Sequence, residues 1–155
     1  MAGRLAAEIQ QRRPFEHVEE EAVLNLVRTA ELLNQKAADY FREFDLSRTQ
    51  YNVLRILRGA GHDALTCSAT AERMISRDPD VTRLMDRMEN RGLITRERTA
   101  NDRRIVLIRL TKAGRELVDS LDVGVSAFHA KLVGRLGATK LRKLIEILEE
   151  VREES

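Results

Sequence analysis

The segment from Ser76 to Leu110 decides the fold, and its sequence is SRDPDVTRLMDRMENRGLITRERTANDRRIVLIRL. Its first half repeats apolar residues at steps of three and four, at Val81, Leu84, Met85 and Met88. This spacing places them on one face of an amphipathic helix. Asp78 is expected to be the N-cap of this helix and Pro79 its first residue, and Gly92 is expected to follow its end.

The second half of the segment changes its period. Residues 93–98 and 105–110 are rich in Ile, Val, Thr and Arg, and this composition predicts two strands. Residues 99–104, TANDRR, are polar and typical of a turn. We therefore expect a β-hairpin with a basic tip directly after the helix.

Apolar patterns on both sides of this segment predict further helices. One long helix is expected between Phe15 and Phe44, with Pro14 just before it. A second helix should begin at Ser47, where S-x-x-Q forms a capping box, and end at Gly59 or Gly61. Thr66 or Ser68 can cap a short third helix. Downstream, Thr111 should cap a helix that Gly137 breaks or bends before a last helix reaches Val151.

The predicted order is four helices, a hairpin and two helices, so the fold class is mainly α with a small β-hairpin wing. A short helix pair followed at once by a two-stranded ribbon defines a winged helix-turn-helix. The chain has 155 residues, a length that suits a single protein chain of this type. The winged lobe is expected to span residues 46–111. The helices within 14–45 and 112–155 would then be dimerisation helices, because their apolar stripes lie outside the lobe.

Charge is concentrated in the same region. The formal net charge is only +2, yet residues 73–115 hold twelve Lys and Arg against six Asp and Glu. Residues 1–72 and 116–155 each carry two more acidic than basic side chains. A localised basic segment is typical of a surface that binds a polyanion. On charge alone, an unevenly charged solvated surface explains the pattern equally well.

The predicted helix and hairpin supply the side chains that a DNA-binding surface needs. Arg83 can pair with a guanine, Thr82 can touch a thymine methyl or a phosphate, and Asp80 can accept from a cytosine amino group. A phosphate contact or an ion pair with Asp80 or Asp86 is the alternative for Arg83, and a helix-start role is the alternative for Asp80. The full set of candidate DNA-binding residues is Arg77, Asp80, Thr82, Arg83, Arg87, Asp102, Arg103 and Arg104.

The hairpin tip is expected to reach the minor groove. An arginine there is attracted most strongly where an A·T-rich groove is narrow. Arg104 is the candidate, and Asp102 can orient its guanidinium through a carboxylate pair. A solvated turn is the alternative for Arg104, and a purely structural part in the turn is the alternative for Asp102.

These residues resemble the MarR-type winged-helix regulators. Residues 81–94 resemble that family's recognition helix and its exit, residues 101–104 resemble its D-x-R wing, and residues 107–115 resemble its strand-to-helix junction. The element order extends the resemblance from about Phe15 to Val151. The chain departs from the family at 78–80, where many members begin the recognition helix with Ser or Thr.

The resemblance implies a homodimer, built from the N- and C-terminal helices, that binds a pseudo-palindromic operator on double-stranded DNA. It matches Arg104 to the family's minor-groove reader and Arg83 to a position that reads bases in several members. It also implies a small aromatic or phenolic effector, for which Tyr40, Phe41 and Phe44 can line a pocket. Core or dimer packing is the alternative for these three aromatic residues.

Other chemistry is not expected from this sequence. There is no glycine-rich phosphate loop and no nucleophile–histidine pairing, so an enzyme is not expected. His17, His62 and His129 are scattered without ligand spacing, and we expect no metal and no cofactor. The helix dipole can lower the pKa of the single cysteine, Cys67, but a small, partly buried residue is the favoured interpretation.

The expected location is the cytoplasm, because one cysteine forms no internal disulfide and the N-terminus lacks a secretory apolar region. No run of apolar residues is long enough for a membrane span. The leading interpretation is a sequence-specific, homodimeric transcriptional regulator, with repression and release by an effector expected. The alternative is a winged-helix dimerisation or adaptor protein that binds protein, for which an arginine-bearing wing has no evident use.

Overall fold

The computed structural model describes residues 4–61, 63–76, 80–99, 102 and 105–153. The chain forms two compact units, residues 1–48 and 49–155. The first unit contains α1 (Arg4–Glu8) and the long helix α2 (Val18–Arg42). The apolar pattern of the sequence predicted α2 but not α1, because a helix of five residues is too short to show a periodic pattern.

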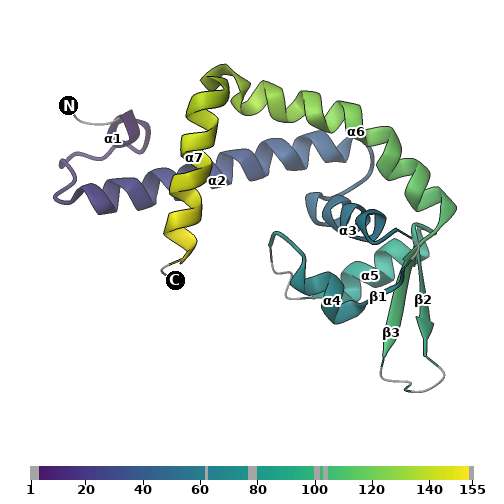
Figure 1. Ribbon diagram of the computed structural model, residues 1–155. Coiled ribbons are helices and arrows are strands. Elements are labelled where there is room, and N and C mark those ends of the chain that lie inside the picture. Colours follow the sequence, from purple (N-terminus) through teal and green to yellow (C-terminus); the bar gives the residue numbers. More distant parts are fainter. Residues whose placement is uncertain (1–3, 62, 77–79, 100–101, 103–104, 154–155) are drawn as a thin grey trace. The chain divides into compact units, whose positions relative to one another are not determined.

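The second unit holds the helices and the sheet of a winged helix-turn-helix (Figure 1). The helix α3 (Arg48–Gly59) leads into it and is followed by the short helix α4 (Cys67–Glu72) and by α5 (Val81–Asn90). The strands are β1 (Leu65–Thr66), β2 (Ile94–Arg98) and β3 (Val106–Leu110). The unit ends with α6 (Lys112–Val133), the 3-10 helix η1 (Gly134–Leu136) and α7 (Gly137–Glu153). The predicted fold class is confirmed.

The sheet has three antiparallel strands in the order β1-β3-β2. The strands β2 and β3, which were predicted to form a hairpin, are paired with Ile94 opposite Leu110 and Arg98 opposite Val106. The third strand, β1, pairs Leu65 with Ile108 and was not predicted. A strand of two residues is too short to show a periodic sequence pattern. β1 is recognised only by its backbone pairing with the edge of β3.

The core of the second unit is formed where α3, α5, the sheet and α6 meet. Side chains from each of these elements are almost completely buried: Val53, Leu54, Leu84, Met85, Met88, Ile94, Ile108, Val118 and Leu121. Burying one such side chain contributes about 1.5–3 kcal/mol. The apolar stripe predicted for 81–88 is therefore the anchor of α5, as expected.

The caps agree with the sequence at two helices and correct it at a third. Thr66 accepts a hydrogen bond from the amide of Ala69 at 3.1 Å, and Thr111 accepts one from Gly114 at 3.0 Å. The N-cap of α5 is Asp80, whose carboxylate accepts from the amide of Arg83 at 3.1 Å. The prediction of Asp78 as this cap is therefore wrong, although Asp78 and Pro79 themselves lie outside the described residues.

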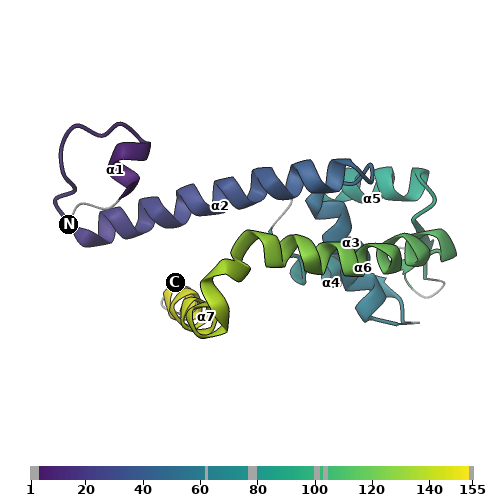
Figure 2. The same ribbon diagram turned by 90° about the horizontal axis from the view of Figure 1, so that it is seen from above.

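The predicted helix ends are confirmed at three glycines. Gly61, Gly92 and Gly137 have φ values of +69°, +68° and +75°, a conformation in which a side chain is strained. At Gly137 the chain turns sharply, and α7 runs at a steep angle to α6 (Figures 1 and 2). No helix in the described part of the chain is both long and apolar enough to cross a membrane.

Candidate nucleic-acid interface

The helix α5 has one buried face and one exposed face. Leu84, Met85 and Met88 are at most 1% exposed and fix the helix to the core. Thr82, Arg83 and Arg87 are exposed on the remaining surface. Because its anchor is apolar and its outer side chains are polar or cationic, α5 can be presented to a groove without losing its packing.

The start of α5 joins two predicted DNA-binding residues to each other. The Nε of Arg83 lies 3.0 Å from Oδ2 of Asp80, while Oδ1 of Asp80 caps the helix. The structure therefore shows the alternative role of each residue, an ion pair for Arg83 and a helix cap for Asp80. The side chain of Arg83 is 83% exposed, so this pair is weak and can exchange for another acceptor.

The hairpin projects beyond α4 and α5 (Figure 1). At its tip, Thr99 donates a side-chain hydrogen bond to the carbonyl of Asp102 at 2.7 Å, and the amide of Ile105 donates to the same carbonyl at 3.0 Å. These bonds give Asp102 a structural part in the turn. The predicted contacts of Arg77, Arg103 and Arg104 fall outside the described residues, and the orienting role of Asp102 toward Arg104 stays a prediction.

An ion-pair network that the sequence did not predict connects α5 to β2. Arg96 donates from Nε and Nη2 to Oε2 of Glu89, at 2.8 and 2.7 Å. Its Nη2 also lies 2.6 Å from Oδ1 of Asp86. These partners raise the pKa of Arg96, chiefly through the hydrogen bond to Glu89. The spacing of seven residues between Glu89 and Arg96 does not predict their contact. Glu89 lies on a helix and Arg96 on a strand, and only the turn at Gly92 brings the two elements together.

The junction between the hairpin and α6 is closely packed. The hydroxyl of Thr111 donates to the carbonyl of Gly92 at 2.6 Å, and its amide donates to the carbonyl of Leu93 at 3.2 Å. Gly114 sits so near that carbonyl that a Cβ would be 2.1 Å from its oxygen. The end of α5, the start of the wing and the first turn of α6 therefore form one rigid corner.

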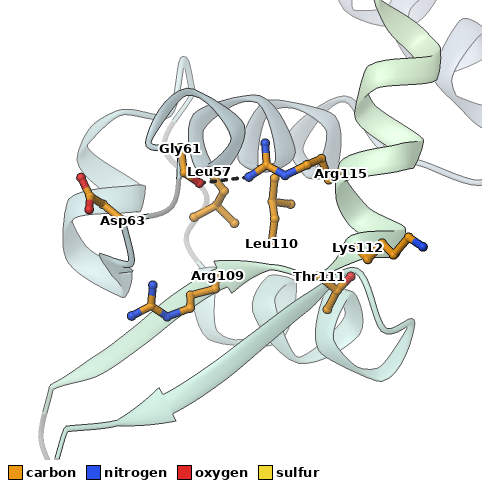
Figure 3. Close-up of a pocket in the computed structure, with 8 residues that line it drawn as sticks. All are labelled: Leu57, Gly61, Asp63, Arg109, Leu110, Thr111, Lys112 and Arg115. Atoms are coloured by element: carbon orange, nitrogen blue, oxygen red, sulfur yellow. Dashed lines mark hydrogen bonds between the residues drawn. The ribbon is translucent and has the colours of Figure 1, made fainter.

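A cavity of about 400 Å³ lies beside this corner (Figure 3). Leu57 and Leu110 line it, and Arg115 reaches across from α6 to donate to the carbonyl of Gly61 at 3.0 Å. Asp63, from the loop after α3, and Arg109, from β3, also line the cavity, as does Lys112 at the start of α6 (Figure 3). Arg115 thus links α6 to the end of α3.

A second unpredicted link joins the same two helices. Arg58 of α3 donates to both carboxylate oxygens of Asp122, at 2.7 and 2.9 Å, and to Asp119 at 3.1 Å. The hydrogen bond from Arg58 lowers the pKa of Asp122. Residues 58 and 122 are 64 positions apart, so only the fold reveals the pairing.

The three aromatic residues predicted to line an effector pocket contact one another in the first unit. The ring of Tyr40 lies 5.2 Å from that of Phe41, edge to face, and 5.4 Å from that of Phe44. Phe41 is buried, which is the packing alternative for this residue. Burial and the nearby Glu43 raise the pKa of Tyr40. Their role in effector binding stays a prediction.

Cys67 is half-buried at the first position of α4, as the favoured interpretation held. Burial raises the pKa of its thiol, and the charge of Arg96 opposes this effect. Among the described residues, no cluster of three or more His, Cys, Asp or Glu side chains is placed to hold a metal ion.

Comparison with known proteins agrees with this geometry. The sequence model of the MarR family matches residues 46–106. The crystal structure of a MarR transcription factor from Planctomyces limnophilus is 37% identical, with a TM-score of 0.69, and the match covers 87% of this chain and 98% of that one. The chain belongs to the MarR family, and it is a winged-helix regulator of that type.

Two curated relatives are similar over much of the chain. The homoprotocatechuate degradative operon repressor of Escherichia coli is 29% identical over 120 residues, which are 75% of this chain and 80% of that repressor. The uncharacterised HTH-type transcriptional regulator YdgJ of Bacillus subtilis is 29% identical over 107 residues, or 69% of this chain. The matched part spans 64% of YdgJ, slightly less than two thirds of its length.

Proposed function

We propose that this protein is a sequence-specific DNA-binding repressor of transcription that acts as a homodimer. The observation that carries the proposal is the exposed face of α5, with Thr82, Arg83 and Arg87, on a helix anchored by buried Leu84 and Met88 beside the hairpin. The major groove of B-DNA, about 12 Å wide, accepts one such helix. Family membership and the name of the E. coli relative support repression.

Homodimer formation is supported by apolar side chains that the single chain leaves exposed. On α7, Leu144, Ile145, Ile147 and Val151 are 39–53% exposed. On α2, Val23, Leu26 and Val27, which share one face of the helix, are 37–61% exposed. A soluble monomer rarely exposes apolar stripes of this extent, so we assign them to a subunit interface. Two recognition helices would then read half-sites of a pseudo-palindromic operator about 34–36 Å apart.

Release from DNA by a small aromatic or phenolic effector is the second part of the proposal. Tyr40 and Phe44 supply aromatic faces for such a ligand, with the buried Phe41 beneath them. A ligand that prefers a dimer with mismatched helix spacing would lower the population able to bind DNA. No cofactor and no catalytic step are part of this function.

The test is an electrophoretic mobility shift with DNA from upstream of the protein's own gene, together with analytical ultracentrifugation. We expect a dimer that shifts one fragment in the presence of excess competitor DNA. Ile145→Glu should give a monomer with weakened operator binding, whereas Lys140→Gln, with the same change in charge, should remain dimeric. A monomer that shifts no promoter fragment would overturn the proposal and favour a protein-binding adaptor.

A further inference from the structure

Arg96 connects the two elements that are proposed to contact DNA. Its guanidinium binds Glu89 through two nitrogens, at 2.8 and 2.7 Å, and Asp86 through one, at 2.6 Å. The backbone amide of Arg96 also donates to Oε1 of Glu89, at 3.1 Å. Glu89 therefore holds both the main chain and the side chain of one strand residue, which restricts β2 more than a side-chain pair alone would.

The network lies on the less exposed side of α5. Asp86 and Glu89 are three residues apart and so are neighbours on the helix surface; Asp86 is also three residues from Arg83, yet its carboxylate lies 2.6 Å from Arg96. The side chains of Arg96 and Glu89 are 25% and 36% exposed, far less than the 83% of Arg83. Arg96 thus faces α5, and Arg83 faces outward.

The base of the hairpin is held against the end of α5 by the corner at Gly92 and Thr111 and by buried Ile94, and Arg96 holds β2 beyond that base. In the sheet order β1-β3-β2, β2 is an edge strand that pairs only with β3. The connection from α5 to β2 consists of Arg91, Gly92 and Leu93, of which Gly92 has a positive φ. Beyond the base of the hairpin, the edge strand β2 needs side-chain contacts to resist twisting relative to α5, and charge-assisted bonds at these distances are strong ones.

The charges of the network also matter beside a polyanion. Two carboxylates on α5 would repel nearby phosphates if they were unpaired. Arg96 offsets part of their negative charge, and its ion pairs with Asp86 and Glu89 hold its guanidinium away from the exposed face of α5 that carries Arg83. Its partners engage two of the guanidinium nitrogens, Nε and Nη2.

We infer that Arg96 is a positioning residue for DNA recognition, which fixes the hairpin relative to α5 so that one subunit contacts the major groove and the adjacent minor groove together. The inference rests on the proposed function, since it concerns how the same surface reads DNA. Arg96 itself does not contact DNA, and its effect passes through Glu89 and Asp86.

The test uses full-length protein and the operator fragment that the wild type protects. Hydroxyl-radical footprints report the minor groove, dimethyl sulfate protection reports major-groove guanines, and a salt titration counts phosphate contacts. Arg96→Gln should weaken operator binding about tenfold, the size of a coupling within one hydrogen-bonded network. Minor-groove protection should be lost at saturating protein while major-groove protection remains, and the salt slope should fall by no more than Arg104→Ala lowers it. Arg135→Gln, on exposed η1, is the control for charge.

Glu89→Gln separates positioning from direct contact. If Arg96 positions the hairpin, losing its main partner should reduce minor-groove protection as Arg96→Gln does. If Arg96 binds phosphate, freeing it should tighten binding beyond the effect of Glu97→Gln, a control on β2 with the same change in charge. Arg96→Lys keeps the charge but loses the forked geometry, so it should resemble Arg96→Gln.

Thermal melting of each variant establishes whether it is folded. If Arg96→Gln does not fold, the footprints of Glu89→Gln and Arg96→Lys test the same inference. The inference is overturned if all three variants keep the wild-type minor-groove footprint, or if Arg96→Gln, added to Arg104→Ala, lowers the salt slope by about one further unit. These results differ from a failure of the proposed function, in which the wild-type protein itself would protect no operator.

Discussion

Gly114 of α6 lies against the carbonyl oxygen of Leu93, so near that a Cβ on residue 114 would be 2.1 Å from that oxygen. The same Cβ would be 3.0 Å from the carbonyl carbon of Leu93 and 3.1 Å from a methyl of Leu110. Glycine is required here because backbone, and not a flexible side chain, occupies the space. The first turn of α6 and the exit of α5 are in this way packed main chain to main chain.

Gly114→Ala should therefore destabilise the protein. We expect a loss of about 1–3 kcal/mol from overpacking, seen as a fall of roughly 2–12 °C in melting temperature. Gly59→Ala is the matched control, because a Cβ at Gly59 meets nothing within 4 Å. Circular dichroism melts measure both, and equal melting temperatures for Gly114→Ala and wild type would contradict the packing.

The link from Arg58 to Asp122 should make stability depend on acid pH. Because Arg58 lowers the pKa of Asp122 below its ordinary 3.8, the folded state binds the proton less readily than the unfolded state. The stabilisation is complete above the ordinary pKa and is lost as pH falls through the lowered one. The difference in melting temperature between wild type and Asp122→Asn should be full near neutral pH and shrink below about pH 4. Asp39→Asn, in an exposed i,i+3 pair with Arg42, should change the melting temperature little.

The carboxylate of Asp80 should stabilise the folded protein and at the same time weaken its binding to non-operator DNA. Asp80→Ala removes the N-cap of α5 and should cost about 1 kcal/mol, whereas Asp80→Ser keeps a capping oxygen and should cost less. Both substitutions remove a negative charge and release Arg83 from its 3.0 Å ion pair. We expect both variants to bind non-operator DNA more tightly in a fluorescence anisotropy titration. Weaker binding by the stable Ser variant would instead indicate that the carboxylate reads a base.

Arg83→Ala should reduce operator affinity by about 1–3 kcal/mol and relax the preference at one base pair. The reason is that Arg83 is the exposed guanidinium nearest the start of α5, where a recognition helix contacts base edges. Binding to a set of operators mutated one base pair at a time measures the effect. A loss of equal size on every sequence would show that Arg83 contacts a phosphate.

Arg104→Ala tests the proposed minor-groove contact of the wing. We expect weaker operator binding and a salt slope lowered by about one unit, because one cationic contact with DNA is removed. Arg135→Gln should leave both quantities unchanged. A wild-type slope for Arg104→Ala, measured from low to moderate salt, would remove Arg104 from the interface.

The sequence alone determined every element of the winged lobe except β1, and several of the element ends. Apolar residues repeating at three and four predicted α5, and its buried side chains Leu84, Met85 and Met88 confirm that face. Strand composition predicted β2 and β3, while Thr66, Thr111, Gly92 and Gly137 marked local boundaries correctly. These features are local, because hydrogen bonds to a cap and the period of a helix involve residues only a few positions apart.

Tertiary structure alone decided which charges meet. The N-cap of α5 is Asp80 and not the predicted Asp78. Both residues are acidic and lie near the helix start, so the local preference for an N-cap residue does not distinguish them. The pairing of Arg96 with Glu89 and Asp86, and that of Arg58 with Asp119 and Asp122, leave no periodic trace in the sequence. Such contacts depend on how a turn directs one element onto another, and side chains 64 positions apart become neighbours only after the core has formed.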